Sequence, residues 1–220
     1  RVRLRFIGAG TATYFDVRIP GLMLTVVAAD GQPVEPVDVD EFRIGPGETY
    51  DVIATIADDK AYAIFAQSMD RTGFVHGVLA PRDGMSADIP PVDPRSWLDP
   101  IDMMGGMAGM AGMGPAGHDH GMVETRTEYG ANTDMRVDFP RTNLDDPGVG
   151  LRRNGRRTLT YADLKTAGPA ADPREPQREI ELHLTGNMER FVWAFDGVKL
   201  NDSKPLHFTP NERLRIILVN

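Results

Sequence analysis

The chain has 220 residues, of which 41% are hydrophobic and 25% charged, a composition typical of a soluble globular protein with one or two domains. Lysine and arginine number 24 against 32 for aspartate and glutamate, and the net charge of −8 argues against binding to the phosphate backbone of nucleic acids. Cysteine is absent, which excludes disulfides and thiolate metal ligands within this chain, and no apolar run is long enough to span a membrane.

The first 90 residues are predicted to form short strands at close spacing. In residues 1–8, arginines alternate with apolar residues that are expected to face a core. Turn formers such as Asp30-Gly31 and Gly45-Pro46-Gly47 separate the later candidates. This spacing predicts an all-β sandwich. The further strand candidates are 14–19, 22–30, 39–44, 49–56, 61–68 and 73–80.

Residues 103–122, MMGGMAGMAGMGPAGHDHGM, form a segment rich in methionine and histidine, the Met/His segment. Its many glycines and Pro115 disfavour a helix, and its lack of β-branched residues disfavours a strand. Thioethers are soft ligands that suit Cu(I), and imidazole suits both Cu(I) and Cu(II). The alternative is a flexible linker of biased composition with no metal role. The candidate metal ligands are Met103, Met104, Met107, Met110, Met113, His118, His120 and Met122.

One short helix is predicted over residues 158–166. Thr160 can cap it, Asp163 occupies the reciprocal position of a capping box, and Gly168 followed by Pro169 ends it. Strands are predicted to return at 178–186, 191–197 and 213–220.

The remaining polar candidates favour structural roles. His76 is expected to be a packed or edge histidine, His183 to lie on a solvent-facing polar side of its strand, and His207 to be isolated. Met188 is expected to pack in a core. None of these histidines has a second ligand at metal spacing, and the aspartate pairs 58–59 and 145–146 look like turn residues. The sequence therefore predicts no catalytic residue.

Residues 1–8 and 213–220 share one pattern of arginine and apolar residues. This similarity suggests that one structural unit appears twice, with the second copy barely begun. Because Arg1 begins in mid-strand and residue 220 closes a strand, the sequence is interpreted as a fragment of a longer protein.

Several blocks resemble the copper-resistance protein A family of bacterial multicopper oxidases, in the same order. They are residues 14–54, 63–81, 144–165, 178–200 and 211–220. The resemblance implies a partial, cupredoxin-like Greek-key β-sandwich with a long irregular linker and one short helix. It further implies part of a second cupredoxin domain at 1–90, a Met/Gly-rich linker at 91–157, and a short helix with the first strands of a third cupredoxin domain at 158–220.

The resemblance also implies a periplasmic parent that oxidises Cu(I) or phenolics, with copper as cofactor and O₂ reduced to water. Expected partners are copper ions and the parent's first and third cupredoxin domains, with no nucleic acid and no membrane span. The family's catalytic His-x-His pairs, His-rich block and His-Cys-His block are not found here; the His-x-His at His118 and His120 lies in the linker. The fragment alone is therefore expected to be inactive.

Two alternatives stay open from the sequence. The first is a non-enzymatic protein that buffers copper through the Met/His segment on a β scaffold. The other is a purely structural β-sandwich module. Reading the sequence that adjoins residues 1–220 would distinguish the oxidase from both alternatives. Copper titration of this chain would distinguish the copper buffer from the structural module.

Overall fold

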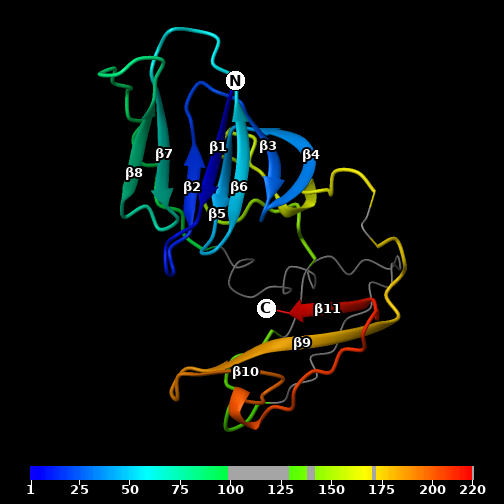
Figure 1. Ribbon diagram of the computed structural model, residues 1–220. Coiled ribbons are helices and arrows are strands. Elements are labelled where there is room, and N and C mark those ends of the chain that lie inside the picture. The colour runs from blue at the N-terminus through cyan, green and yellow to red at the C-terminus, as the bar shows by residue number, and fades with distance from the viewer. Residues whose placement is uncertain (99–128, 138–141, 170–171, 220) are drawn as a thin grey trace, which may run out of the picture. The chain divides into compact units, whose positions relative to one another are not determined.

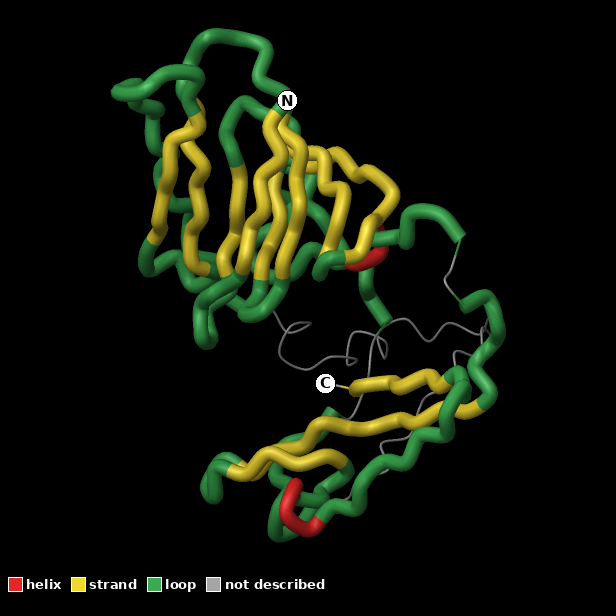
Figure 2. Tube along the Cα trace, viewed as in Figure 1, coloured by secondary structure: helices red, strands yellow, loops and turns green. Residues whose placement is uncertain are grey.

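The computed structural model describes residues 1–98, 129–137, 142–169 and 172–219 (Figure 1). The chain divides into two compact units: Arg1–Leu98 with Asn143–Ala170, and Asp99–Thr142 with Ala171–Asn220. Strands make up nearly all the regular structure of both units, as Figure 2 shows. Among the described residues, no helix is long and apolar enough to cross a membrane. The prediction of an all-β class is confirmed.

The first unit consists of two four-stranded sheets. The first sheet has the order β1-β6-β3-β4 and the second has the order β5-β2-β7-β8. Every pair of neighbours in both sheets is antiparallel. The strands are β1 (Val2–Ile7), β2 (Phe15–Arg18), β3 (Leu24–Ala29), β4 (Gln32–Val39), β5 (Glu41–Ile44), β6 (Thr49–Ala54), β7 (Tyr62–Ser68) and β8 (Phe74–Leu79).

The core of the first unit lies between these two sheets. Alternate residues on each strand face it, because successive side chains of a strand point to opposite sides. Val26 and Val52 reach the core from the first sheet, and Val17 and Phe42 from the second. The Phe42 ring packs against the rings of Phe6 and Tyr50, with centroid distances of 5.1 and 5.3 Å. The predicted inward face of residues 1–8 is confirmed.

Sequence reasoning missed strand β4. It pairs with β3 through a tight turn at Asp30 and Gly31, both of which have positive φ, as the predicted hairpin turn requires. Pro33 and Pro36 lie within β4 and argue against a central strand. The structure resolves the conflict because β4 is the edge strand of its sheet.

The predicted helix at 158–166 is wrong in extent. Only a single turn of 3₁₀ helix forms, η2 (Tyr161–Asp163), although the predicted capping box is present at Thr160 and Asp163. On either side the backbone bonds to the first unit instead: the Leu159 N–H donates to the Glu41 carbonyl. Segment 143–167 thus belongs with the first unit.

The described residues of the second unit form a three-stranded sheet of order β10-β9-β11, with β9 (Arg178–Asn187), β10 (Val192–Phe195) and β11 (Leu214–Val219). The β9–β10 pair is antiparallel and the β9–β11 pair is parallel. A 3₁₀ turn, η3 (Leu200–Asp202), lies between β10 and β11. The three strand predictions are confirmed, with boundaries that differ by one or two residues.

Candidate functional site

The predicted metal ligands all lie outside the described residues. Met103, Met104, Met107, Met110, Met113, His118, His120 and Met122 fall within 99–128. Among the residues that the structure does describe, no group of three or more histidine, aspartate or glutamate side chains is arranged to hold a metal ion. The described part of the chain therefore does not fit a catalytic copper centre, and the Met/His segment remains a candidate on its residue chemistry alone.

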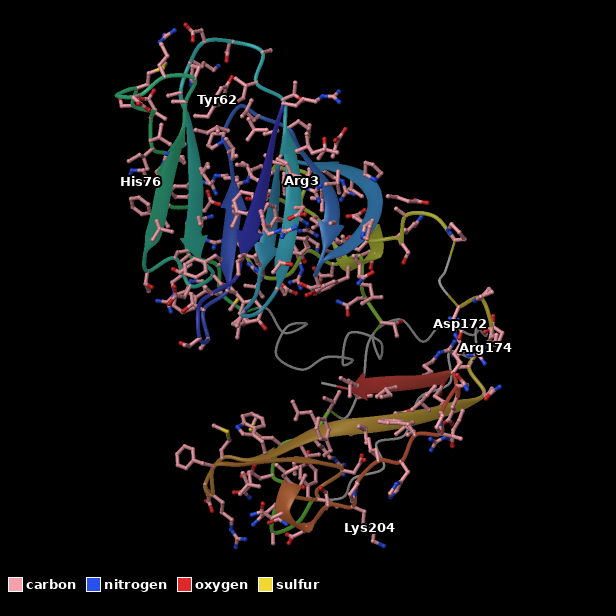
Figure 3. The ribbon with its side chains drawn as sticks, in the orientation of Figure 1. Arg3, Tyr62, His76, Asp172, Arg174 and Lys204 are labelled. Carbon is pink, nitrogen blue, oxygen red and sulfur yellow. The ribbon has the colours of Figure 1, made fainter. Side chains whose placement is uncertain are left out.

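The three described histidines, His76, His183 and His207, belong to three different segments of the chain. His76 lies exposed on β8, the edge strand of the second sheet, as Figure 3 shows, and this confirms the expected edge position. His207 is exposed in the segment before β11. His183 was expected in solvent, but only 1% of it is exposed.

His183 is buried because the polar side of β9 is the covered one. Its Nε2 lies 2.5 Å from Glu181 Oε1, and its Nδ1 has no hydrogen-bond partner among the described residues. Thr185 and Asn187, on the same side of the strand, are also buried. The alternation along β9 was predicted correctly, but the side that faces solvent was not. A carboxylate that orients an imidazole is typical of a histidine near a metal, yet one histidine does not make a site.

The described methionines are mostly exposed. Met188, which was expected to pack, is 52% exposed, and Met135 is 48% exposed. Both belong to the second unit. Met23 and Met69 of the first unit are exposed as well. These thioethers have no core to fill.

Charged and polar side chains cluster on the outer face of the second sheet, the side that points away from the core. Neighbouring strands place opposite charges directly across from each other there: Asp16 faces Arg43, and Arg18 faces Glu41. Gln67 on β7 lies on the other side of Asp16. Asp16, Glu41 and Gln67 are each 0% exposed. A buried charge destabilises a fold unless it is paired, so the stability of this charged face depends on the ion-pair and hydrogen-bond partners of its residues.

Asp16 is held between two arginines. Its carboxylate accepts hydrogen bonds from Arg43 Nε at 2.7 Å, and Arg71 Nη1 lies 2.6 Å from Oδ2. Arg43 Nη2 also donates to the Val149 carbonyl at 2.7 Å. Gly148 has φ +89°, and a Cβ there would lie 2.9 Å from Arg43 Nη1. The loop after residue 146 therefore needs glycine in order to approach the arginine closely.

Asp146 fixes the start of that loop. It accepts hydrogen bonds from Arg152 Nε at 2.7 Å and from the Gly148 N–H at 2.9 Å. These bonds, with that of Arg152 foremost, lower the pKa of Asp146 to about 2. The carboxylate thus stays ionised at neutral pH, as a turn residue rather than as an acid–base catalyst.

Glu41 and Asp93 join the sheet to two other segments. Arg18 donates to both carboxylate oxygens of Asp93, at 3.1 and 3.2 Å, and Gln67 Nε2 donates to Asp93 at 2.7 Å. Arg156 pairs with Asp93 and lies 2.8 Å from Glu41. The two carboxylates and two guanidiniums balance in charge. Burial raises the pKa of Asp93, but the Gln67 hydrogen bond and the charges of Arg18 and Arg156 more than offset this, so the pKa lies below its ordinary value.

The contact between Asp93 and Arg156 brings together chain regions from either side of residues 99–128. Asp93 precedes them and Arg156 follows them in the sequence, and both are held on the charged face. Sequence reasoning missed this face, because alternating charges on a strand usually indicate solvent. The available signal was that adjacent strands carry opposite charges in register, in FDVR and EFRI.

Comparisons with known proteins agree on one family. The family model described as multicopper oxidase matches residues 1–82. A copper resistance protein A homolog of Pseudomonas syringae pv. tomato is 49% identical over 100% of this chain and 42% of its own length. Copper resistance protein A of Escherichia coli is 47% identical over 100% of this chain and 44% of its own. This chain thus spans less than half the length of these curated relatives.

Solved structures include the multicopper oxidase Fet3p, described as functioning in iron import. The two sequences are 14% identical, and the match covers 89% of this chain and 28% of the Fet3p chain, with a TM-score of 0.44.

Proposed function

We propose that this chain, which belongs to the copper resistance protein A family of multicopper oxidases, is part of a periplasmic oxidase that confers copper resistance. The observation that carries the proposal is the identity of 49% and 47% to two copper resistance proteins over the whole chain. The activity proposed is that of the longer polypeptide: oxidation of Cu(I) or phenolics, with O₂ reduced to water. Its partners are copper ions and the parent's other cupredoxin domains.

Within that polypeptide, this chain has two roles. The first unit is a scaffold whose charged face holds the chain at Asp93 and Arg156. The Met/His segment captures copper through thioether and imidazole ligands. Copper at the catalytic centres supplies one-electron oxidation, but the described residues offer no set of ligands for those centres. Catalysis is therefore assigned to other parts of the parent.

The first test separates the parent's activity from this chain. The full-length polypeptide is expected to consume O₂ with Cu(I) or a phenol, whereas this chain alone is expected to consume none. Loaded with Cu(II), the chain should show no intense blue absorption, because it has no cysteine to supply a thiolate. An oxygen electrode and a visible spectrum check both points. O₂ consumption by the isolated chain, or its absence from the full-length protein, would contradict the assignment.

The second test concerns copper capture by the Met/His segment. Thioethers carry no proton to lose, so Cu(I) binding through the six methionines is expected to persist in acid. Binding through His118 and His120 should weaken as the imidazoles protonate near their ordinary pKa of about 6.5. A Cu(I) competition titration at neutral and acidic pH measures both components.

The matched variants replace either one methionine or all six of the segment by leucine. A single replacement should change little, because six thioethers are more than one Cu(I) ion needs. Replacing all six should remove the acid-resistant binding and spare the histidine component. Equal Cu(I) binding by the wild type and the six-leucine variant in acid would identify the segment as a linker. Strong binding in a full-length protein without oxidase activity would favour the copper-buffer alternative.

A further inference from the structure

Asn154 and Gly155 form a dipeptide that is chemically labile in water. Among the chain's asparagines, only Asn154 is followed by glycine. The backbone nitrogen of such a glycine can attack the asparagine Cγ atom, because glycine has no Cβ to obstruct the approach. The N–Cγ bond forms, the Cγ–Nδ2 bond breaks, and Nδ2 leaves as ammonia with the proton of the attacking nitrogen. Water then opens the resulting imide ring to give aspartate or isoaspartate.

The structure leaves this dipeptide open to water but holds its side chain. Gly155 is exposed, and a Cβ at its position would meet nothing within 4 Å. Asn154 is half-buried, and its two amide atoms have separate partners: Nδ2 donates to the Glu41 carboxylate, and Oδ1 accepts from the Arg156 N–H at 2.9 Å. Because Nδ2 is the leaving group, its bond to Glu41 has to break before the reaction can finish. That bond therefore slows the loss of ammonia.

The product of this reaction would place a new charge beside a buried carboxylate. Glu41 is fully buried, and its partners are Arg156 at 2.8 Å and Arg18 at 3.8 Å. Deamidation would remove the Nδ2 donor and bring a second carboxylate against Glu41, and like charges that share a buried site destabilise it. Isoaspartate would also lengthen the backbone by one carbon. Either product weakens the attachment of segment 143–167, which contains Asn154.

We propose that Asn154 is a site of spontaneous deamidation which its bond to Glu41 holds in check, and that the reaction, once it occurs, loosens segment 143–167 from the first unit. The chain itself is the substrate and water is the co-reactant, so the reaction needs neither copper nor an enzyme. Local opening of the charged face releases Asn154 to react. The new carboxylate then opposes closing, so a reversible opening becomes a lasting change.

Peptide mapping by mass spectrometry tests whether the fold protects Asn154. The full chain is incubated at mildly alkaline pH, once folded and once in guanidinium chloride, and the conversion of every asparagine is followed with time. In the unfolded chain Asn154 is expected to react first. In the folded chain it should react at least about tenfold more slowly, the factor that corresponds to one hydrogen bond to a charged group.

The matched control is L144G, which creates a second asparagine–glycine dipeptide at Asn143 in the same chain. Asn143 also donates to a carboxylate, that of Asp146 at 3.2 Å, but it is exposed, as is Leu144. In folded L144G, Asn143 should react at a rate close to that of the unfolded chain while Asn154 stays protected. Equal rates for Asn154 in the folded and unfolded chains, or equal protection of Asn143 and Asn154, would overturn the proposal.

N154D tests the effect of the product, because it introduces the carboxylate directly. Its urea unfolding midpoint should fall below that of the wild type, whereas N143D, which sets an exposed carboxylate beside Asp146, should stay close to it. A second measurement needs no variant: in wild-type chain aged until Asn154 is partly converted, limited proteolysis should cut segment 143–167 of the converted molecules first. Equal midpoints for N154D and N143D, or equal cleavage of converted and unconverted molecules, would contradict the proposed loosening.

Discussion

Replacing Glu41 by alanine is expected to lower the free energy of unfolding of the first unit by about 3–5 kcal/mol. Glu41 is fully buried and is paired with Arg156 at 2.8 Å, while Arg18 lies 3.8 Å away. Its removal leaves an excess of positive charge on a largely buried face, where the Arg18 side chain is 7% and the Arg156 side chain 25% exposed. Burial already lowers the pKa of Arg18, with the nearby Arg156 charge adding to this effect, which shows how unfavourable that excess is.

The measurement is urea unfolding followed by circular dichroism, compared with wild type. A small domain has about 5–15 kcal/mol of stability in total, so this loss should move the midpoint strongly. The matched control is D59A, which removes the exposed ion pair between Asp59 and Arg82 and should cost less than about 1 kcal/mol. If E41A costs no more than D59A, the charged face is not the anchor proposed here.

Most strands were predictable from the sequence because their signals are local. Alternation in residues 1–8 and the turn at Asp30-Gly31 each depend on neighbours in the chain, and both appear as expected. Strand β4 was not predictable in the same way. Its prolines are tolerated because β4 is the edge strand of its sheet and its pairing with β3 shifts register between Val26 and Ala28, and neither fact can be read from the local sequence.

Which side of a strand is buried was harder to predict than the strand itself. Asp16 and Arg18 alternate with apolar residues, and so does His183, and both patterns ordinarily indicate a solvent-facing side. In the structure all three are buried. For Asp16 and Arg18 the cover comes from residues 91–93 and 149–156, which are remote in sequence and offer carbonyls and opposite charges. No local pattern encodes such a cover.

The prediction of a helix at 158–166 was wrong for a related reason. The cap at Thr160 and Asp163 is a genuine local signal, and it forms one turn. A longer helix would have to give up the bond from Leu159 to Glu41 and the bridge from Thr166 to Val34. Since an isolated helix of this length is marginal in water, the tertiary contacts prevail. The candidate copper ligands could be named from composition alone, whereas the Asp93–Arg156 contact could be found only from the fold.

The same contacts lead to the last prediction: a chain cut once within residues 105–112 should keep its two pieces together without denaturant. Segment 143–167 is held on the first unit by the Asp93–Arg156 pair, by backbone hydrogen bonds such as Glu35 N–H to the Lys165 carbonyl at 2.8 Å, and by buried Leu159. A specific protease site introduced there, followed by gel filtration at about 10 µM, measures the association. Survival at that concentration requires a Kd below roughly 1 µM, or about 8 kcal/mol of binding free energy.

Two substitutions decide whether the segment itself holds the pieces together. L159D places a charge in the core, and R156A removes the guanidinium that joins segment 143–167 to Asp93 and Glu41, so the cut double variant is expected to separate into two peaks. The uncut double variant should still elute as one chain, and the cut D59A protein should stay associated, since its ion pair lies elsewhere on the surface.

Separation of the cut wild-type pieces would show that the contacts of segment 143–167 are too weak to anchor it. Continued association of the cut double variant would place the anchor elsewhere. Association that depends on Leu159 and Arg156 would identify the charged face and the adjoining core as the surface that holds segment 143–167 on the first unit, independently of any bound copper.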